Sequence, residues 1–124
     1  MPQVDLIIDT YLHVVAEEAA MRVGDPAFGV EIWPLWNCVV SEERGSEGVR
    51  WALDDARFTG TCEVWLKRLS DDSCLARAFV RVDPRRPWPD LAVKWHRRRA
   101  RARAQAALWS LKDQLECADS VDAG

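Results

Sequence analysis

Long apolar runs are absent from the sequence, and none approaches the roughly 18 residues that a membrane-spanning helix needs. The first residues include Asp5 and Asp9 and carry no basic segment, so we expect no secretory signal. The four cysteines, at positions 38, 62, 74 and 117, form no CxxC pair and lack the spacing of zinc ligands. From these absences we expect a cytoplasmic protein with reduced thiols, no membrane contact and no structural metal.

Motifs that carry catalysis are also missing. The sequence contains no GxSxG, HExxH, P-loop or GxGxxG pattern. His13 lies four residues from both Asp9 and Glu17, a trio that could hold a metal, although such polar spacing is ordinary on a solvated helix face. His96 could act as a base, but no nucleophile is suggested for it by spacing. We therefore expect no enzyme activity, no catalytic residue, no metal site and no cofactor.

The composition is that of one globular domain. The chain has 124 residues, of which 48% are hydrophobic and 30% are charged. We expect a single α+β domain over 1–117 and a flexible acidic tail over 118–124. Residues 1–80 hold 14 acidic and 7 basic side chains, whereas 81–115 hold 10 basic and 3 acidic ones. With a net charge of -3, an acidic body and an arginine-rich C-terminal segment exclude a uniformly basic nucleic-acid coat.

The hydrophobic pattern predicts an α+β fold with an N-terminal helix, a three- or four-stranded antiparallel sheet and a long C-terminal helix (αβββ(β)α). Apolar residues at helical spacing predict a helix over 3–23, which Gly24 and the Asp25-Pro26 pair end. Alternation predicts strands at 30–40 and 49–55. A hairpin follows, in which 61–69 and 74–82 flank the polar loop 70–73. If Leu69 faces Cys74, the core face of this hairpin includes Trp65, Leu69, Cys74, Ala76, Ala78, Val80 and Val82.

The C-terminal helix has two apolar stripes where packing on one sheet needs only one. It follows a proline-rich connector at 83–90, begins at Asp90 or Trp88 and runs to about Cys117. One stripe consists of Val93, Ala100, Ala104, Ala107, Leu108, Leu111 and Leu115. The opposite stripe consists of Trp88, Leu91, Trp95, Ala102, Ala106 and Trp109. The second stripe is covered either by the chain's own N-terminal part or by a second molecule.

Arginines concentrate on the same helix. Five of the seven residues from Arg97 to Arg103 are arginine, and like charges four positions apart repel. Phosphates, or carboxylates of this chain or of a partner, would offset that repulsion. The stretch HRRRARARAQAALWSL resembles the basic, alanine-rich final helix of the double-stranded RNA-binding domain, and the predicted element order is similar. The strand region over 28–83 is longer than in that family, and the family's Gly-Pro-x-His-like loop is absent, so no site is carried over.

Two functions remain as hypotheses. The first is a non-enzymatic protein-binding module, such as a small inhibitor, an immunity protein or a phage-type anti-defence protein, that docks on another protein or on a second copy of itself. The alternative is an RNA- or DNA-binding domain that uses Arg97–Arg103. No small-molecule substrate is evident. The predicted partner-binding residues are Trp88, Trp95, Arg98, Arg99, Arg101, Arg103 and Trp109.

Overall fold

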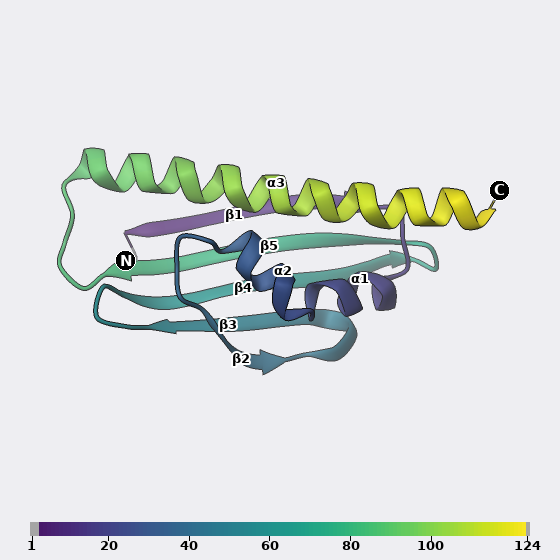
Figure 1. Ribbon diagram of the computed structural model, residues 1–124, viewed down its shortest axis with the longest axis horizontal. Helices are drawn as coiled ribbons and strands as arrows, with labels where there is room; N and C mark the ends of the chain where they lie inside the picture. The colour runs from purple at the N-terminus through teal and green to yellow at the C-terminus, as the bar shows by residue number, and fades with distance from the viewer. Residues whose placement is uncertain (1–2, 124) are drawn as a thin grey trace.

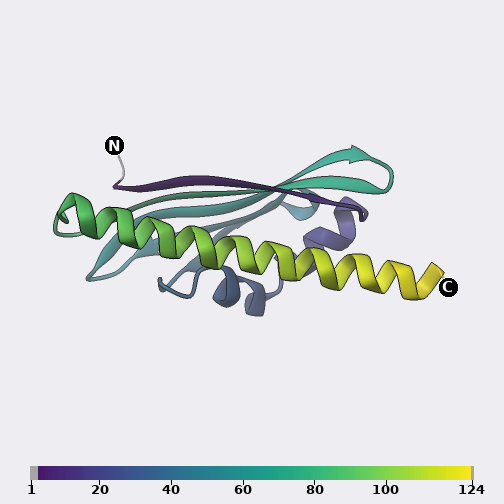
Figure 2. The ribbon, with the colours of Figure 1, turned by 90° about the horizontal axis from the view of Figure 1, so that it is seen from above.

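One antiparallel sheet and a long helix dominate the computed structural model, which describes residues 3–123 and the side chains of 3–117. The five strands are ordered β1-β5-β4-β3-β2. The helices α2 and α3 lie side by side over one face, here called the inner face, and neither crosses the opposite, outer face (Figures 1 and 2). The elements are β1 (Val4–Leu12), α1 (Ala16–Val23), α2 (Pro26–Ile32), β2 (Val39–Glu43), the short η1 (Gly45–Glu47), β3 (Gly48–Asp54), β4 (Phe58–Ser70), β5 (Ser73–Pro84) and α3 (Asp90–Ala123).

The core lies between the inner face and the helices. Alternate residues of β1 and β5 point inward because side chains along a strand alternate between its two faces. Among them are Val4, Leu6, Ile8, Ala76, Ala78 and Val80, all buried. The helix α3 covers them with Ala100, Ala104, Ala107, Leu108, Leu111 and Leu115, which are also buried. The first predicted stripe of this helix is therefore confirmed, with Val93 partly buried at its start.

The coarse sequence prediction is confirmed: the chain is α+β, with an antiparallel sheet and a long C-terminal helix. The strand at 49–55 corresponds to β3, and the C-terminal helix begins at Asp90. The backbone of α3 continues to Ala123. The domain boundary at residue 117 and the flexible tail stay predictions.

The predicted N-terminal helix over 3–23 is wrong. Residues Val4–Leu12 form β1, which pairs antiparallel with β5 from Val4↔Val82 to Leu12↔Cys74. Only Ala16–Val23 is helical in this region. The apolar positions fit helical spacing because Ile7 and Tyr11 are apolar too, although both lie exposed on the outer face. A strand that is apolar on both faces produces the same short spacings as an amphipathic helix.

The predicted strand over 30–40 is also wrong in its first part. Residues Pro26–Ile32 form α2, and β2 begins only at Val39. The Asp25 side chain accepts a hydrogen bond from the Ala27 N–H at 2.9 Å, and Pro26 occupies the first turn. Aspartate at the N-cap followed by proline starts a helix as readily as a proline ends one. The pair that was interpreted as a stop is therefore the start of a second helix.

The hairpin is confirmed, but the facing of its first strand is wrong. A bulge between Arg68 and Ser70 places Arg68, not Leu69, opposite Cys74. A shift of one residue moves every side chain of a strand to the other face. Cys62, Val64 and Leu66 are therefore buried on the inner face, whereas Trp65 and Leu69 lie exposed on the outer face.

Candidate functional site

Six aromatic rings meet between the sheet and the N-terminal half of α3. We call this group the aromatic cluster. Two rings come from the segment after α2, one from β3, one from the start of β4, one from the connector before α3 and one from α3 itself. The members are Trp33, Trp36, Trp51, Phe58, Trp88 and His96.

His96 lies at the centre of the cluster. Its ring centroid is 4.8 Å from that of Trp88, 5.6 Å from Trp36 and 5.7 Å from Phe58, against which it stacks at 25°. Trp33 continues the cluster toward the sheet, at 6.3 Å from Trp36. These separations are those of favourable edge-to-face and offset ring pairs. The cluster therefore presents flat, polarisable surfaces around one imidazole.

Three polar atoms in the cluster are buried without a hydrogen-bond partner: Trp33 Nε1, Trp36 Nε1 and His96 Nε2. Trp33 is 1% exposed, and Trp36 and His96 are each 8% exposed, so bulk water does not hydrate them freely. Leaving a buried donor unpaired costs about 1–3 kcal/mol, and native proteins rarely do so. Three such atoms in one cluster indicate a place where a polar group from outside the chain can bind.

Hydrogen bonds hold the backbone of Trp88 at the outer side of the cluster. The Gln3 amide donates to the Trp88 carbonyl, and the Trp88 N–H donates to Gln3 Oε1, both at 3.2 Å. The Gln3 N–H in turn donates to Asp83 Oδ1 at 2.6 Å. The start of β1 therefore holds the connector that carries Trp88. On the sheet side, a Cβ at Gly29 would lie 2.9 Å from Trp51 Nε1, so α2 approaches that indole closely because position 29 lacks a side chain.

The imidazole of His96 is held neutral. Burial lowers its pKa, and the nearby positive charges of Arg99 and Arg57 lower the pKa further. A neutral imidazole has one donor and one acceptor nitrogen. Together with two indole N–H donors, His96 can recognise a ligand that carries a carbonyl or hydroxyl group on an apolar body.

The predicted partner-binding residues separate into two groups. Trp88 belongs to the aromatic cluster, whereas Trp95 and Trp109 are 59% and 56% exposed on the side of α3 that faces away from the sheet. Arg99 lies over the Trp95 ring at 5.0 Å. Arg98, Arg101 and Arg103 are exposed, and no side chain of residues 3–117 forms an ion pair with them. Their role in partner binding stays a prediction.

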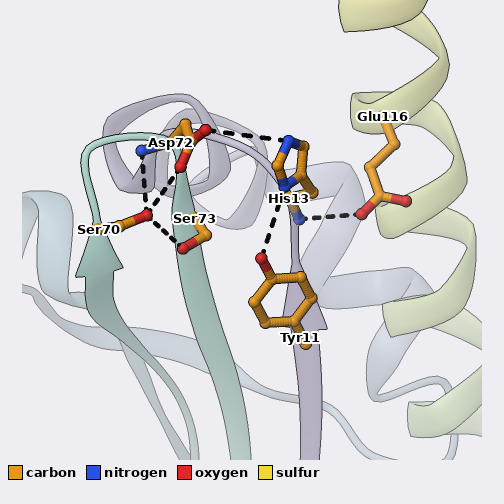
Figure 3. Close-up of polar contacts among 6 residues, drawn as sticks. All are labelled: Tyr11, His13, Ser70, Asp72, Ser73 and Glu116. Carbon is orange, nitrogen blue, oxygen red and sulfur yellow. Dashed lines mark hydrogen bonds and ion pairs between the residues drawn. The ribbon is translucent and has the colours of Figure 1, made fainter.

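The trio of His13, Asp9 and Glu17 does not share a helix face. Asp9 lies in β1 and pairs with Arg77 at 2.6 Å, and Glu17 pairs with Arg68. Figure 3 shows the His13 imidazole beside the β4–β5 turn, 4.0 Å from Asp72, while its backbone N–H donates to Glu116 of α3 at 2.9 Å. His13 therefore joins the end of β1 to α3.

Two further findings concern the described residues alone. They contain no group of three or more His, Cys, Asp or Glu side chains placed to hold a metal ion. Within them, no helix is both long and apolar enough to cross a membrane. The predicted cytoplasmic location stays a prediction.

Sequence reasoning missed the cluster as a site. His96 was considered only as a base without a nucleophile, and Trp33, Trp36 and Trp51 were assigned to strands. The available signal was the high tryptophan content, seven residues in all, combined with a histidine next to Trp95 near the start of a helix. That signal does not state which rings meet, because this depends on how the segment over 33–38 folds back on α3.

Solved structures share this fold. No protein-family model matches the sequence, and no curated protein matches it. A START superfamily protein from Mycobacterium smegmatis is 16% identical, with 90% of this chain and 98% of that chain covered and a TM-score of 0.67. The Aha1 dimer from Colwellia psychrerythraea is 12% identical, with 91% and 96% covered and a TM-score of 0.62. The di-domain ARO/CYC StfQ from the steffimycin biosynthetic pathway is 14% identical, with 94% and 52% covered and a TM-score of 0.52.

These similarities establish the fold and overturn the function expected from the sequence. The inhibitor, immunity or anti-defence module is wrong, and so is the RNA- or DNA-binding alternative, because the chain has the fold of the START superfamily and Aha1 structures. The expected partners, another protein or nucleic acid with no small-molecule substrate, are overturned by the same finding and by the likeness to StfQ from a biosynthetic pathway. Within the described residues, the second stripe of α3 is not covered by the chain's N-terminal part, because Leu91, Trp95 and Trp109 are exposed.

Proposed function

We propose that this protein binds a small, largely aromatic molecule with a hydrogen-bond acceptor at the aromatic cluster, and that it does so without converting the molecule chemically. The observation that carries the proposal is the convergence of three unpartnered buried polar atoms inside a box of aromatic rings. The fold shared with a START superfamily protein supports it. Small-molecule sites are typically apolar with a few convergent polar groups, as here.

The rings of the cluster touch one another, so a ligand enters by displacing one of them. The Trp88 indole is the ring best placed to move, because it is half-buried and because Gln3 bonds only to the backbone of this residue. A ligand ring then takes its place beside His96 and Phe58. The carbonyl of the ligand accepts a hydrogen bond from the indole N–H of Trp36 or Trp33, which removes the cost of leaving that donor unpaired.

The absence of catalysis is part of the proposal. His96 Nε2 has no hydrogen-bond partner, so this nitrogen belongs to no base–nucleophile pair of the kind that covalent catalysis requires. A binding role needs no such pair.

The test compares two neutral probes of the same shape. 2-Acetylnaphthalene carries a carbonyl and 2-ethylnaphthalene does not. We expect the ketone to bind about two- to tenfold more tightly, the range that one neutral hydrogen bond supplies. Backbone amide shifts measured by NMR are expected over 33–38 and at Phe58, Trp88 and His96.

A variant checks the location. Trp33→Phe combined with Trp36→Phe keeps a ring at both positions and removes both indole N–H groups, and we expect it to abolish the preference for the ketone over the hydrocarbon, whereas His13→Gln leaves that preference unchanged. Equal affinities for ketone and hydrocarbon, or amide shifts confined to another part of the chain, would contradict the proposal.

A further inference from the structure

The outer face of the sheet, opposite α2 and α3, contains a hollow that we call the outer groove. Its volume is about 760 Å³, and its walls are formed mainly by β4 and β5, with Arg50 of β3 on one side and Ala16, Ser46 and Glu47 at one end. Pockets for small molecules commonly measure about 300–1,000 Å³. The groove is therefore large enough for a ligand of that class, and the sheet separates it from the aromatic cluster.

Strand register places apolar and basic side chains together in the groove. Phe79 lies opposite Glu63, Arg77 opposite Trp65 and Arg81 opposite Thr61, all on the outer face. Leu75 and Phe79 are half-buried and form an apolar floor, and Trp65 stands beside them. Neighbouring side chains on one sheet face lie within contact distance. Apolar and charged side chains therefore alternate along the groove, with Arg77 between Leu75 and Phe79 and with Arg81 beyond Phe79.

The β3 side of the groove is held in place by a small network. Glu63 accepts hydrogen bonds from Trp65 Nε1 at 2.6 Å and forms an ion pair with Arg50 at 3.0 Å. The Arg44 guanidinium lies over the Trp65 ring, 4.1 Å from its centroid. These contacts fix the orientation of the Trp65 ring, so little side-chain entropy remains to be lost when a ligand stacks on it.

The lining of the groove contains more basic than acidic side chains, although the chain as a whole has a net charge of -3. Its lining includes five basic side chains and two acidic ones. Three of the basic groups are already neutralised: Arg50 by Glu63, Arg68 by Glu17 and Arg77 by Asp9.

Lys67 and Arg81 differ from the other basic groups, because neither forms an ion pair with any side chain of residues 3–117. Asp5 is the cross-strand neighbour of Arg81 on β1, and it too stays unpaired with this guanidinium. Arg81 therefore stands next to Phe79 without an ion pair of its own among the described side chains. A guanidinium in that position favours a carboxylate.

We propose that the outer groove is a second ligand site that takes a small aromatic carboxylate. The aromatic ring lies over Phe79 and beside Trp65, and the carboxylate pairs with Arg81. This site is independent of the proposed function at the aromatic cluster and goes beyond it, because the two sites lie on opposite faces of the sheet.

The test uses 2-naphthoate, which has the ring system of 2-acetylnaphthalene with a carboxylate in place of the ketone. We expect amide shifts at Thr61, Phe79 and Arg81 in an NMR titration. Arg81→Gln is expected to weaken naphthoate binding about tenfold or more, because a charge-assisted hydrogen bond is lost. Lys94→Gln, an equal charge change on the exposed surface of α3, is expected to leave the affinity unchanged. Binding is also expected to weaken as salt rises.

The outcomes separate the two sites. Shifts confined to the aromatic cluster, equal weakening in both variants, or no binding of naphthoate up to its solubility limit would overturn the outer-groove proposal and leave the cluster proposal standing. A further part of the test measures co-sedimentation of the protein with vesicles of phosphatidylglycerol. Co-sedimentation with these vesicles in the absence of naphthoate binding would assign the groove to an anionic lipid surface and would also overturn the proposal.

Discussion

His96 is a titratable group enclosed by aromatic rings. Burial and the charges of Arg99 and Arg57 lower its pKa below the ordinary value of 6.5. Protonating this imidazole in the folded state therefore costs more than protonating it in the unfolded chain. The consequence is a link between pH and stability at a single residue.

We expect the free energy of unfolding to fall as the pH is lowered through 6.5. The unfolded chain binds a proton at His96 near that pH, whereas the folded chain resists protonation until a lower pH, so the stabilising effect of the neutral ring is fully present above 6.5 and is lost toward the folded pKa. Urea unfolding at a series of pH values measures this slope. The slope should flatten in His96→Phe and persist in His13→Gln; the same slope in both variants would show that another group is responsible.

Individual residues explain why the site was harder to predict than the fold. The tryptophans at 33, 36 and 51 are visible in the sequence, but their meeting with His96 depends on a loop that no periodicity describes. The helix wheel places Trp88 on the exposed stripe of α3, and this is wrong, because Trp88 lies before the first residue of the helix and packs against Phe58 and His96. Side-chain identity alone does not state which rings share a core.

The helix α3 has one face that supports the fold and one that does not. Leu108 is fully buried against the sheet, whereas its neighbour Trp109 is 56% exposed. Two adjacent residues of similar hydrophobicity therefore differ in what they contribute, because successive residues of a helix are separated by about 100°.

We expect Leu108→Ala to lower the free energy of unfolding by about 2–5 kcal/mol, since it removes buried methyl groups and leaves a cavity. Trp109→Ala is expected to change it by less than about 1 kcal/mol, because the ring is mainly in solvent. Chemical denaturation of both variants measures the difference. A comparable loss in Trp109→Ala would mean that the exposed stripe is buried in an assembly.

Elements with strong periodicity could be predicted from the sequence, and elements defined by a local irregularity could not. The hairpin and α3 extend over many alternations or turns, so a few residues that break the pattern do not hide it. The bulge between Arg68 and Ser70 has no such signature, yet it reverses the facing of β4. The prediction for β1 failed for a related reason. Its outer face also carries apolar residues, so the spacing of all its apolar residues fits a helix.

At the scale of the whole molecule, the sheet is best secured at its centre. The strands β4 and β5 have hydrogen-bonded neighbours on both sides, whereas β2 is an edge strand whose five residues are all exposed and whose pairing with β3 is interrupted by an irregularity. Local opening is easiest where few buried contacts must break.

We expect the backbone amides of β4 and β5 to exchange with solvent deuterium most slowly and those of β2 most rapidly. Hydrogen exchange followed by NMR at neutral pH measures the order directly. The amides of Val39 and Val40 on β2 can be compared with those of Ala78 and Val80 on β5. Protection of β2 equal to that of β5 would indicate that a further strand or chain pairs with this edge.

The pairing of β1 with β5 has a consequence for folding during translation. Strand β1 is synthesised before β5 and must wait for residues up to Val82 before its partner is complete. At translation speeds of about 5–20 residues per second, this delay lasts roughly several seconds. During that interval the segment around Leu6 and Ile8 has neither partner strand nor covering helix. Until β5 is complete, β1 is an unpaired strand with apolar side chains, which favours aggregation, and a chaperone that shields Val4–Leu12 protects this segment during the delay.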